Sequence, residues 1–130
     1  MNAAAYHEDV AAYYDAEAED FEARAGQNHV LEQLRQVFRN VTMAYHPKHV
    51  LEIGYGPGLD MVWFANQPDV ETVYGLDVTP TFHRIVSEKS EARDDDKLRP
   101  MLGSAEDAQE MMGGTTVDTV IVFFGALNTT

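Results

Sequence analysis

Three glycines, Gly54, Gly56 and Gly58, stand where an apolar segment passes into a segment of helical character. Glycine adopts backbone conformations with positive φ, and it lets a ligand approach the backbone without a Cβ in the way. Amides at the start of the following helix can donate hydrogen bonds to a polar or anionic group. A turn of this kind also occurs as a tight strand-to-helix connection without a ligand, so the glycines alone leave both interpretations open.

Asp77 adds a second chemical group, at the end of the next predicted strand. A carboxylate in this place can accept hydrogen bonds from both hydroxyls of a ribose, as in dinucleotide-binding folds, or it can simply cap the following turn. Together with the glycines it favours a nucleoside site. A dinucleotide fingerprint, G-x-G-x-x-G, starting at Gly54 requires glycine at position 59. The residue there is Leu59, which disfavours a nicotinamide-dependent dehydrogenase.

The elements that must position these groups follow from hydrophobic periodicity. A first helix is predicted over 3–25. Asn28 can cap a second helix with a regular apolar stripe, formed by Val30, Leu31, Leu34, Val37, Phe38 and Val41. Strands are predicted at 50–53, 70–76, 98–102 and 117–124, and helices at 59–65, after Thr79-Pro80 and at 106–112.

Alternation of apolar strands with helices predicts an α/β fold: a three-layer, Rossmann-like parallel sheet with helices on both faces, preceded by two N-terminal helices. The 130 residues suit one domain, with helices over 1–45 and the alternating core over 49–130. Ligands of such sheets bind beyond the carboxyl ends of the strands, where the glycines and Asp77 are expected to lie.

The segment 50–58, Val-Leu-Glu-Ile-Gly-Tyr-Gly-Pro-Gly, closely resembles the first motif of class I S-adenosylmethionine-dependent methyltransferases. The resemblance extends from about Tyr14 to Leu127, with the motifs in the family's order. It implies S-adenosylmethionine as cofactor and methyl transfer as activity. Glu52 and the three glycines would lie under the methionine part of the cofactor. Asp77 would bind the ribose hydroxyls, and Val78 would pack against the adenine.

The resemblance continues beyond the first motif. Residues 103–107, Gly-Ser-Ala-Glu-Asp, resemble the third motif, in which an acidic residue and the next amide contact the adenine edge. Ser104 stands where aspartate is common, so a hydroxyl there and the amide of Ala105 would make this contact. Asp118 opens the fourth strand as in the family. The cofactor-binding residues implied are Glu52, Gly54, Tyr55, Gly56, Gly58, Asp77, Val78, Ser104, Ala105, Glu106, Phe124 and Tyr14.

No catalytic residue is assigned from the sequence. Methyl transfer from a sulfonium mainly requires that donor and acceptor be held in line, and a base is needed only where the acceptor must lose a proton early. His83 lies close after Asp77 and is a candidate for that base. His46 and His49 flank a Pro-Lys pair without a placed carboxylate, a pattern more typical of surface residues than of a metal site.

The composition restricts partners and location. With 22 acidic and nine basic residues, the net charge is −13, which repels phosphate backbones and favours a small-molecule acceptor over nucleic acid. Only three residues are lysines, and this suggests the hypothesis of adaptation to high salt. Cysteine is absent, no signal peptide is visible, and the apolar runs are too short to cross a bilayer. A cytoplasmic enzyme is expected.

The family's sheet normally has seven strands, whereas this sequence reaches the fourth. The sequence is therefore expected to be truncated relative to the family. It is a fragment, a subunit completed by a partner or by self-association, or a reduced module that binds the cofactor without methyl transfer. An exposed edge at the fourth strand favours a homo-oligomer.

Overall fold

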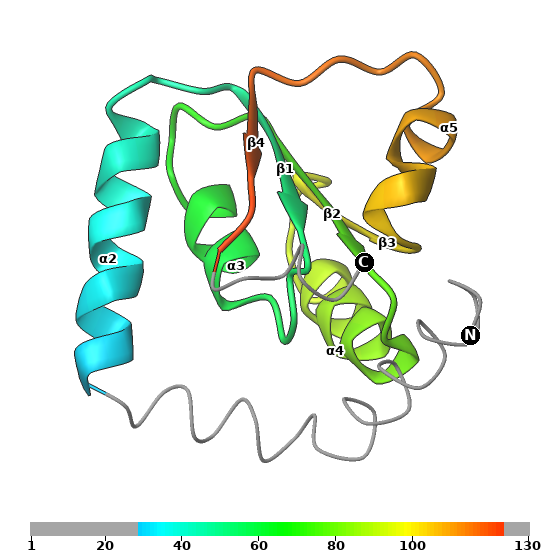
Figure 1. The fold of residues 1–130 in the computed structure, drawn as a ribbon, viewed down its shortest axis with the longest axis horizontal. Helices are drawn as coiled ribbons and strands as arrows, with labels where there is room; N and C mark the ends of the chain where they lie inside the picture. The colour runs from blue at the N-terminus through cyan, green and yellow to red at the C-terminus, as the bar shows by residue number, and fades with distance from the viewer. Residues whose placement is uncertain (1–28, 124–130) are drawn as a thin grey trace.

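A computed structural model describes residues 29–123, which form a four-stranded parallel sheet in the order β3-β2-β1-β4 with helices on both faces (Figure 1). The elements in chain order are α2 (His29–Met43), β1 (His49–Ile53), α3 (Leu59–Ala65), β2 (Thr72–Asp77), α4 (Pro80–Glu91), β3 (Leu98–Leu102), η1 (Ala105–Asp107), α5 (Ala108–Met112) and β4 (Thr119–Ile121). The helix expected over 3–25 lies outside the described residues.

The predicted fold class is confirmed, and most element boundaries agree within two residues. The prediction of β4 was too long, because only Thr119–Ile121 pair with β1. The helix expected over 106–112 is divided into the 3-10 turn η1 and the short helix α5. Thr79 precedes α4 as expected, with Pro80 in the first turn, but its hydroxyl makes no hydrogen bond to that turn. Extended backbone at Thr79 and the fixed φ of Pro80 therefore define this helix start.

Two apolar layers cover the sheet. The larger layer lies between the sheet and the helices α3 and α4, and its main side chains are Val50, Met61, Phe64, Val73, Phe82, Val86, Leu98 and Ile121. The smaller layer lies on the opposite face, under α5, and is built on Leu51, Ile53 and Leu76. Because side chains alternate along a strand, Glu52 lies on the same face as Val50, toward α3.

Helix α2 lies with its polar face inward. An apolar helical stripe ordinarily faces the core, but Val30, Leu34, Val37 and Val41 are 43–75% exposed. The buried residues of α2 are Arg35, Arg39 and Thr42 instead. None of the helices within residues 29–123 is long and apolar enough to cross a bilayer.

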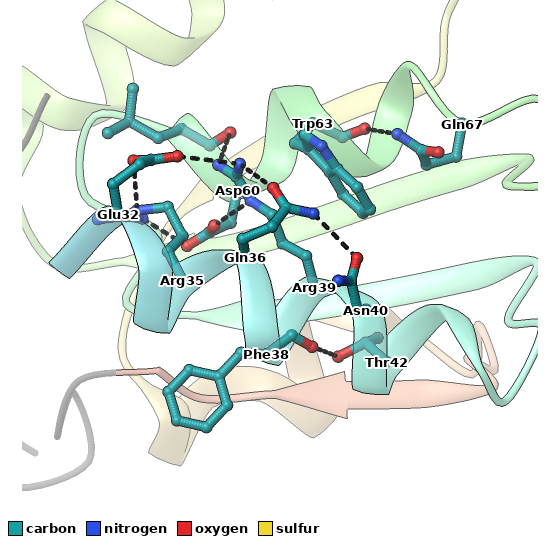
Figure 2. Close-up of polar contacts among 11 residues, drawn as sticks. Glu32, Arg35, Gln36, Phe38, Arg39, Asn40, Thr42, Asp60, Trp63 and Gln67 are labelled. Carbon is teal, nitrogen blue, oxygen red and sulfur yellow. Dashed lines mark hydrogen bonds and ion pairs between the residues drawn. The ribbon is translucent and has the colours of Figure 1, made fainter. Parts of the chain in front are cut away.

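Buried ion pairs hold α2 in this orientation (Figure 2). Arg35 Nη1 lies 2.7 Å from Asp60 Oδ2, and Arg39 Nε lies 2.9 Å from Asp60 Oδ1. Arg39 also donates a hydrogen bond to the carbonyl of Leu59 and lies over the ring of Trp63. Both guanidinium groups thus bind the first turn of α3, which begins directly after the glycine-rich turn.

Two separate constraints favour glycine at position 58. Its φ of +84° lies in the left-handed region, and a Cβ built on it would lie 2.6 Å from Cγ2 of Val86 on α4. The turn after β1 and helix α4 can therefore approach this closely only because residue 58 has no side chain.

We expect Gly58→Ala to destabilise the chain more than Gly114→Ala. Gly114 has a similar φ of +88° with open space around it, so it serves as the matched control for backbone strain alone. Left-handed alanine costs about 1–2 kcal/mol, and the contact with Val86 should add roughly 1–3 kcal/mol of overpacking at residue 58. Urea unfolding of both variants measures the difference, and equal losses would contradict the packing argument.

Candidate functional site

The turn after β1 is built from left-handed glycines. Gly54, Gly56 and Gly58 have φ values of 73°, 57° and 84°. The amide of Gly54 donates to the carbonyl of Leu76 at 2.7 Å, so the turn starts while β1 is still paired with β2. The backbone then turns sharply into α3. Because glycine has no side chain, the surface of the turn at these three residues consists of main-chain atoms.

Asp77 connects this turn to the end of β2. Its Oδ2 accepts a hydrogen bond from the amide of Gly56 at 2.9 Å, and its Oδ1 accepts one from the amide of Thr79 at 3.0 Å. Burial raises the pKa of Asp77, while these two amides act in the opposite direction. A carboxylate offers about four lone-pair sites, so each oxygen can accept a further hydrogen bond from a ligand hydroxyl.

The end of β3 lies next to Asp77. The amide of Gly103 donates to the carbonyl of Asp77 at 2.8 Å. Ser104 then forms a capping box with Asp107, in which the Ser104 hydroxyl oxygen accepts from the backbone amide of Asp107 and Asp107 Oδ2 accepts from the amide of Ser104. The Ser104 hydroxyl also donates to Asp107 Oδ2. The turns after β1, β2 and β3, which carry most of the residues singled out in the sequence, are thus connected at one end of the sheet.

The remaining predicted residues occupy different environments. Val78 and Ala105 are half-buried beside these turns, and Glu106 is exposed on η1. The ring of Tyr55 is directed into the core, where it packs on Gly75 and its hydroxyl donates to the carbonyl of Met101. Tyr55 therefore belongs to the turn through its backbone only. Tyr14 and Phe124 lie outside the described residues.

Glu52 is buried within a cluster of charges that the sequence analysis did not foresee. Asp60, Arg35, Asp77 and Arg39 all act on its carboxyl group. Within residues 29–123 its Oε1 has no hydrogen-bond partner. Burial, followed by the nearby Asp60, raises the pKa of Glu52 well above its usual range, and Arg35 only partly opposes this.

Asp60 and the two arginines of α2 are the residues that sequence reasoning missed. Burial raises the pKa of Asp60, and both guanidinium groups oppose that effect. A signal was present, because Arg35 and Arg39 are spaced by one helical turn and are the only arginine or lysine residues of α2. Nothing in the sequence indicated that their partner would be the second residue of α3.

The histidines do not form a metal centre in the described part of the chain. No group of three His, Asp or Glu side chains there is placed to hold a metal ion. The ring of His49 lies 2.6 Å from the hydroxyl of Thr72 and 3.4 Å from Glu71. His83 is half-buried in the first turn of α4, close to the turn that contains Asp77.

Several solved structures, methyltransferases among them, have a similar fold. An O-methyltransferase from Bacillus cereus, in complex with SAH, shares 18% identity and superposes with a TM-score of 0.61 over 85% of this chain. The SAH-bound methyltransferase PaMTH1 from Podospora anserina shares 17% identity and superposes with a TM-score of 0.58 over 94% of this chain. Cofactor-bound Rv0187 from MTB shares 24% identity and superposes with a TM-score of 0.57 over 69% of this chain. At these identities, the likeness establishes the Rossmann-like fold.

The present chain spans about half the length of these structures, between 42% and 61% of each. No protein-family model matches the sequence, and no curated protein matches it either. Fold similarity and site geometry therefore carry the functional argument.

The environment of Glu52 predicts a pH dependence of stability. A carboxyl group whose pKa is higher in the folded than in the unfolded state binds its proton more tightly when folded. The contribution of this group to the free energy of unfolding is complete below its pKa in the unfolded state. It is lost as the pH rises toward its pKa in the folded state. Glu52→Gln should remove this loss because the amide stays neutral at every pH, with a gain in unfolding free energy at about pH 8 on the order of 1–3 kcal/mol.

Urea unfolding at about pH 5 and about pH 8 measures this effect, with Glu110→Gln on the exposed surface of α5 as the control. The expected gain is larger at the higher pH and absent in the control. A stability change of Glu52→Gln that is equal at both pH values would show that Glu52 does not titrate as argued.

Proposed function

We propose that this chain binds S-adenosylmethionine at the carboxyl ends of β1, β2 and β3, as part of a methyltransferase that acts on a small-molecule acceptor. The observation that carries the proposal is the carboxylate of Asp77. It is fixed between the glycine-rich turn and the start of α4, with further capacity to accept hydrogen bonds. A ribose with two free hydroxyls satisfies that capacity.

The charges of the site fit this cofactor better than a dinucleotide. Glu52, Asp60 and Asp77 bring three carboxyl groups to one end of the sheet. Asp60 is paired with Arg35 and Arg39, so the carboxyl groups of Glu52 and Asp77 are the ones left to favour a ligand that carries a positive sulfonium and ammonium over the pyrophosphate of NAD. The buried Oε1 of Glu52, unpaired within residues 29–123, is the kind of acceptor that a ligand or an ordered water would satisfy.

Each turn supplies a different part of the proposed site. The backbone of Gly54, Tyr55, Gly56 and Gly58 would lie against the methionine part, with Glu52 beneath it. Val78 would pack on the adenine, whose edge would be contacted by the Ser104 hydroxyl and the Ala105 amide, beside Glu106. The Ser104 hydroxyl already donates to Asp107, so toward the adenine it would act as an acceptor. Tyr14 and Phe124 remain proposed contacts from outside the described residues.

When bound, the cofactor supplies an electrophilic methyl group on its sulfonium sulfur. The part of this chain is to hold the donor rigidly, because fixing both reactants in line removes much of the entropic barrier. The hydrogen bonds of Asp77 to the turns after β1 and β2 serve that purpose. His83 is the proposed base for an acceptor that must lose a proton.

The acidity of the chain supports a small-molecule acceptor rather than nucleic acid, since 22 acidic residues repel a phosphate backbone. A cytoplasmic location, and self-association through the free edge of β4, are parts of the same proposal.

A non-catalytic module that binds S-adenosylmethionine or another adenosine ligand is the alternative. Transfer of tritium from labelled cofactor onto a metabolite extract would support the methyltransferase, whereas tight binding with no transfer would favour the module.

Calorimetric titration of the full chain in high salt, first with S-adenosylhomocysteine and then with NAD, tests the cofactor assignment. We expect binding of S-adenosylhomocysteine alone. Asp77→Asn should weaken it by about 1.5–3 kcal/mol, the range for a hydrogen bond to a charged group. Binding of NAD instead would contradict the proposal.

Asp118→Asn is the matched control for Asp77→Asn. Asp118 also accepts two backbone amides, from Lys48 and His49, but at the amino-terminal end of the sheet. Its substitution should leave the affinity for S-adenosylhomocysteine unchanged. If Asp77→Asn folds normally and binds as tightly as the wild type, Asp77 has been assigned wrongly.

Adaptation to high salt is proposed from the charge of −13 and the three lysines. Repulsion among exposed carboxylates is screened by salt and grows as salt is removed. We therefore expect the circular dichroism signal of the folded chain to be lost on dialysis from molar KCl into dilute buffer. A circular dichroism signal that is unchanged in dilute buffer would contradict adaptation to high salt.

A further inference from the structure

The carboxyl group of Glu52 is buried without a partner of its own. Glu52 is 2% exposed, and its Oε1 has no hydrogen-bond partner within residues 29–123. Its neighbours across the sheet are Gly75 on β2 and Ile121 on β4, neither of which has a polar side chain. In such a place the ionised form of a carboxyl group is costly unless a cation comes close to it.

The charged groups that surround Glu52 do not remove this cost. Helix α3 contributes Asp60, β2 contributes Asp77, and α2 contributes Arg35 and Arg39. Both arginines are bound to the two oxygens of Asp60, at 2.7 and 2.9 Å, and Asp77 is held by two backbone amides. Burial and the charge of Asp60 outweigh the arginines and raise the pKa of Glu52. In the free chain Glu52 therefore keeps its proton at pH values at which exposed glutamates are ionised.

The two forms of the proposed cofactor differ in the charge that they bring to this carboxyl group. Glu52 lies on β1 two residues before Gly54, at the end of the sheet where the cofactor is proposed to bind. S-adenosylmethionine carries a positive sulfonium, whereas the sulfur of S-adenosylhomocysteine is a neutral thioether. Apart from the transferred methyl group, the two ligands are otherwise the same. An opposite charge nearby favours the ionised form of a carboxyl group, so the two ligands should act differently on Glu52.

We propose that Glu52 is a specificity-determining residue, which releases its proton when S-adenosylmethionine binds and thereby favours this charged donor over the product S-adenosylhomocysteine. The inference rests on the proposed function and identifies the positive charge of the sulfur as the property that the site distinguishes. On binding of the donor, Glu52 gives its proton to solvent, and the charge of the ligand compensates the carboxylate. Once the sulfur is a neutral thioether, Glu52 takes up a proton from solvent again. The product is thus held less tightly than the donor.

Proton release by Glu52 fixes the direction of the pH dependence. Because linkage between two bound species is reciprocal, a ligand that displaces a proton binds more tightly as the pH rises. The affinity for S-adenosylmethionine should increase between the pKa of Glu52 in the complex and its higher pKa in the free chain, and should be constant outside that range. The affinity for S-adenosylhomocysteine should change less. Both ligands carry the same amino acid group, so the titration of that group cancels in the ratio of the two dissociation constants.

Calorimetric titration of the full chain with each ligand, between about pH 5.5 and about pH 7.5 at constant salt, tests the proposal. The dissociation constant of S-adenosylhomocysteine divided by that of S-adenosylmethionine should rise about tenfold across this range, as expected for an opposite charge near a carboxyl group. Buffers of different ionisation enthalpy should show that more protons are released with S-adenosylmethionine. A ratio that does not change with pH would overturn this proposal alone. Absence of binding by both ligands would contradict the proposed function as well.

Variants at position 52 separate the charge of Glu52 from its part in packing. Glu52→Gln keeps the size of the side chain but cannot ionise, so the ratio should become independent of pH and both ligands should release the same number of protons. Glu52→Asp keeps the carboxyl group and should retain a ratio that rises with pH. Glu110→Gln, on the exposed surface of α5, is the matched control and should behave as the wild type. A ratio that still rises with pH in Glu52→Gln would show that another group releases the proton and would refute the assignment.

Discussion

Burial of three carboxyl groups at one end of a small parallel sheet is the constraint on which the rest of the structure depends. A buried carboxylate is costly unless charges or hydrogen bonds compensate it. Asp60 is compensated by Arg35 and Arg39 from α2, and Asp77 by the amides of Gly56 and Thr79. Glu52 receives only the distant influence of the same arginines, and its pKa is raised as a result. Glu52 is thus the least compensated of the three carboxyl groups, and a positively charged ligand would stabilise its ionised form.

The orientation of α2 follows from that constraint. The guanidinium groups can bind Asp60 only if the polar side of the helix faces α3, so the apolar side must face away from it (Figure 2). Exposure of a few valines and a leucine is unfavourable at about 25 cal/mol per Å². Leaving Asp60 buried without both cations would cost several kcal/mol, an amount comparable to the gain from burying four such side chains at about 1.5–3 kcal/mol each. Because the ion pairs fix the polar side of α2 against α3, the apolar side is left exposed.

Much of the fold could be predicted from the sequence, because strands and turns are local. The apolar period gave β1, β2 and β3 within two residues, and the glycines with Asp77 marked the turns that the structure brings together. Three features were beyond such reasoning. Periodicity shows that α2 has an apolar face but not that an ion pair turns it outward. The pairing of Arg39 with Asp60 joins residues far apart in the chain. The ring of Tyr55 enters the core because Gly75, on the neighbouring strand, leaves space for it.

The proposed cofactor site and the exposed side of α2 are connected through one structural element. Arg39 binds both Asp60 and the carbonyl of Leu59, so α2 is attached to the first turn of α3, directly after Gly58. On its inner side α2 thus fixes the start of α3, directly after the glycine-rich turn, and on its outer side it exposes Val30, Leu34, Val37 and Val41. The same two ion pairs therefore determine both the position of the helix that follows the glycine-rich turn and the side of α2 that faces away from α3.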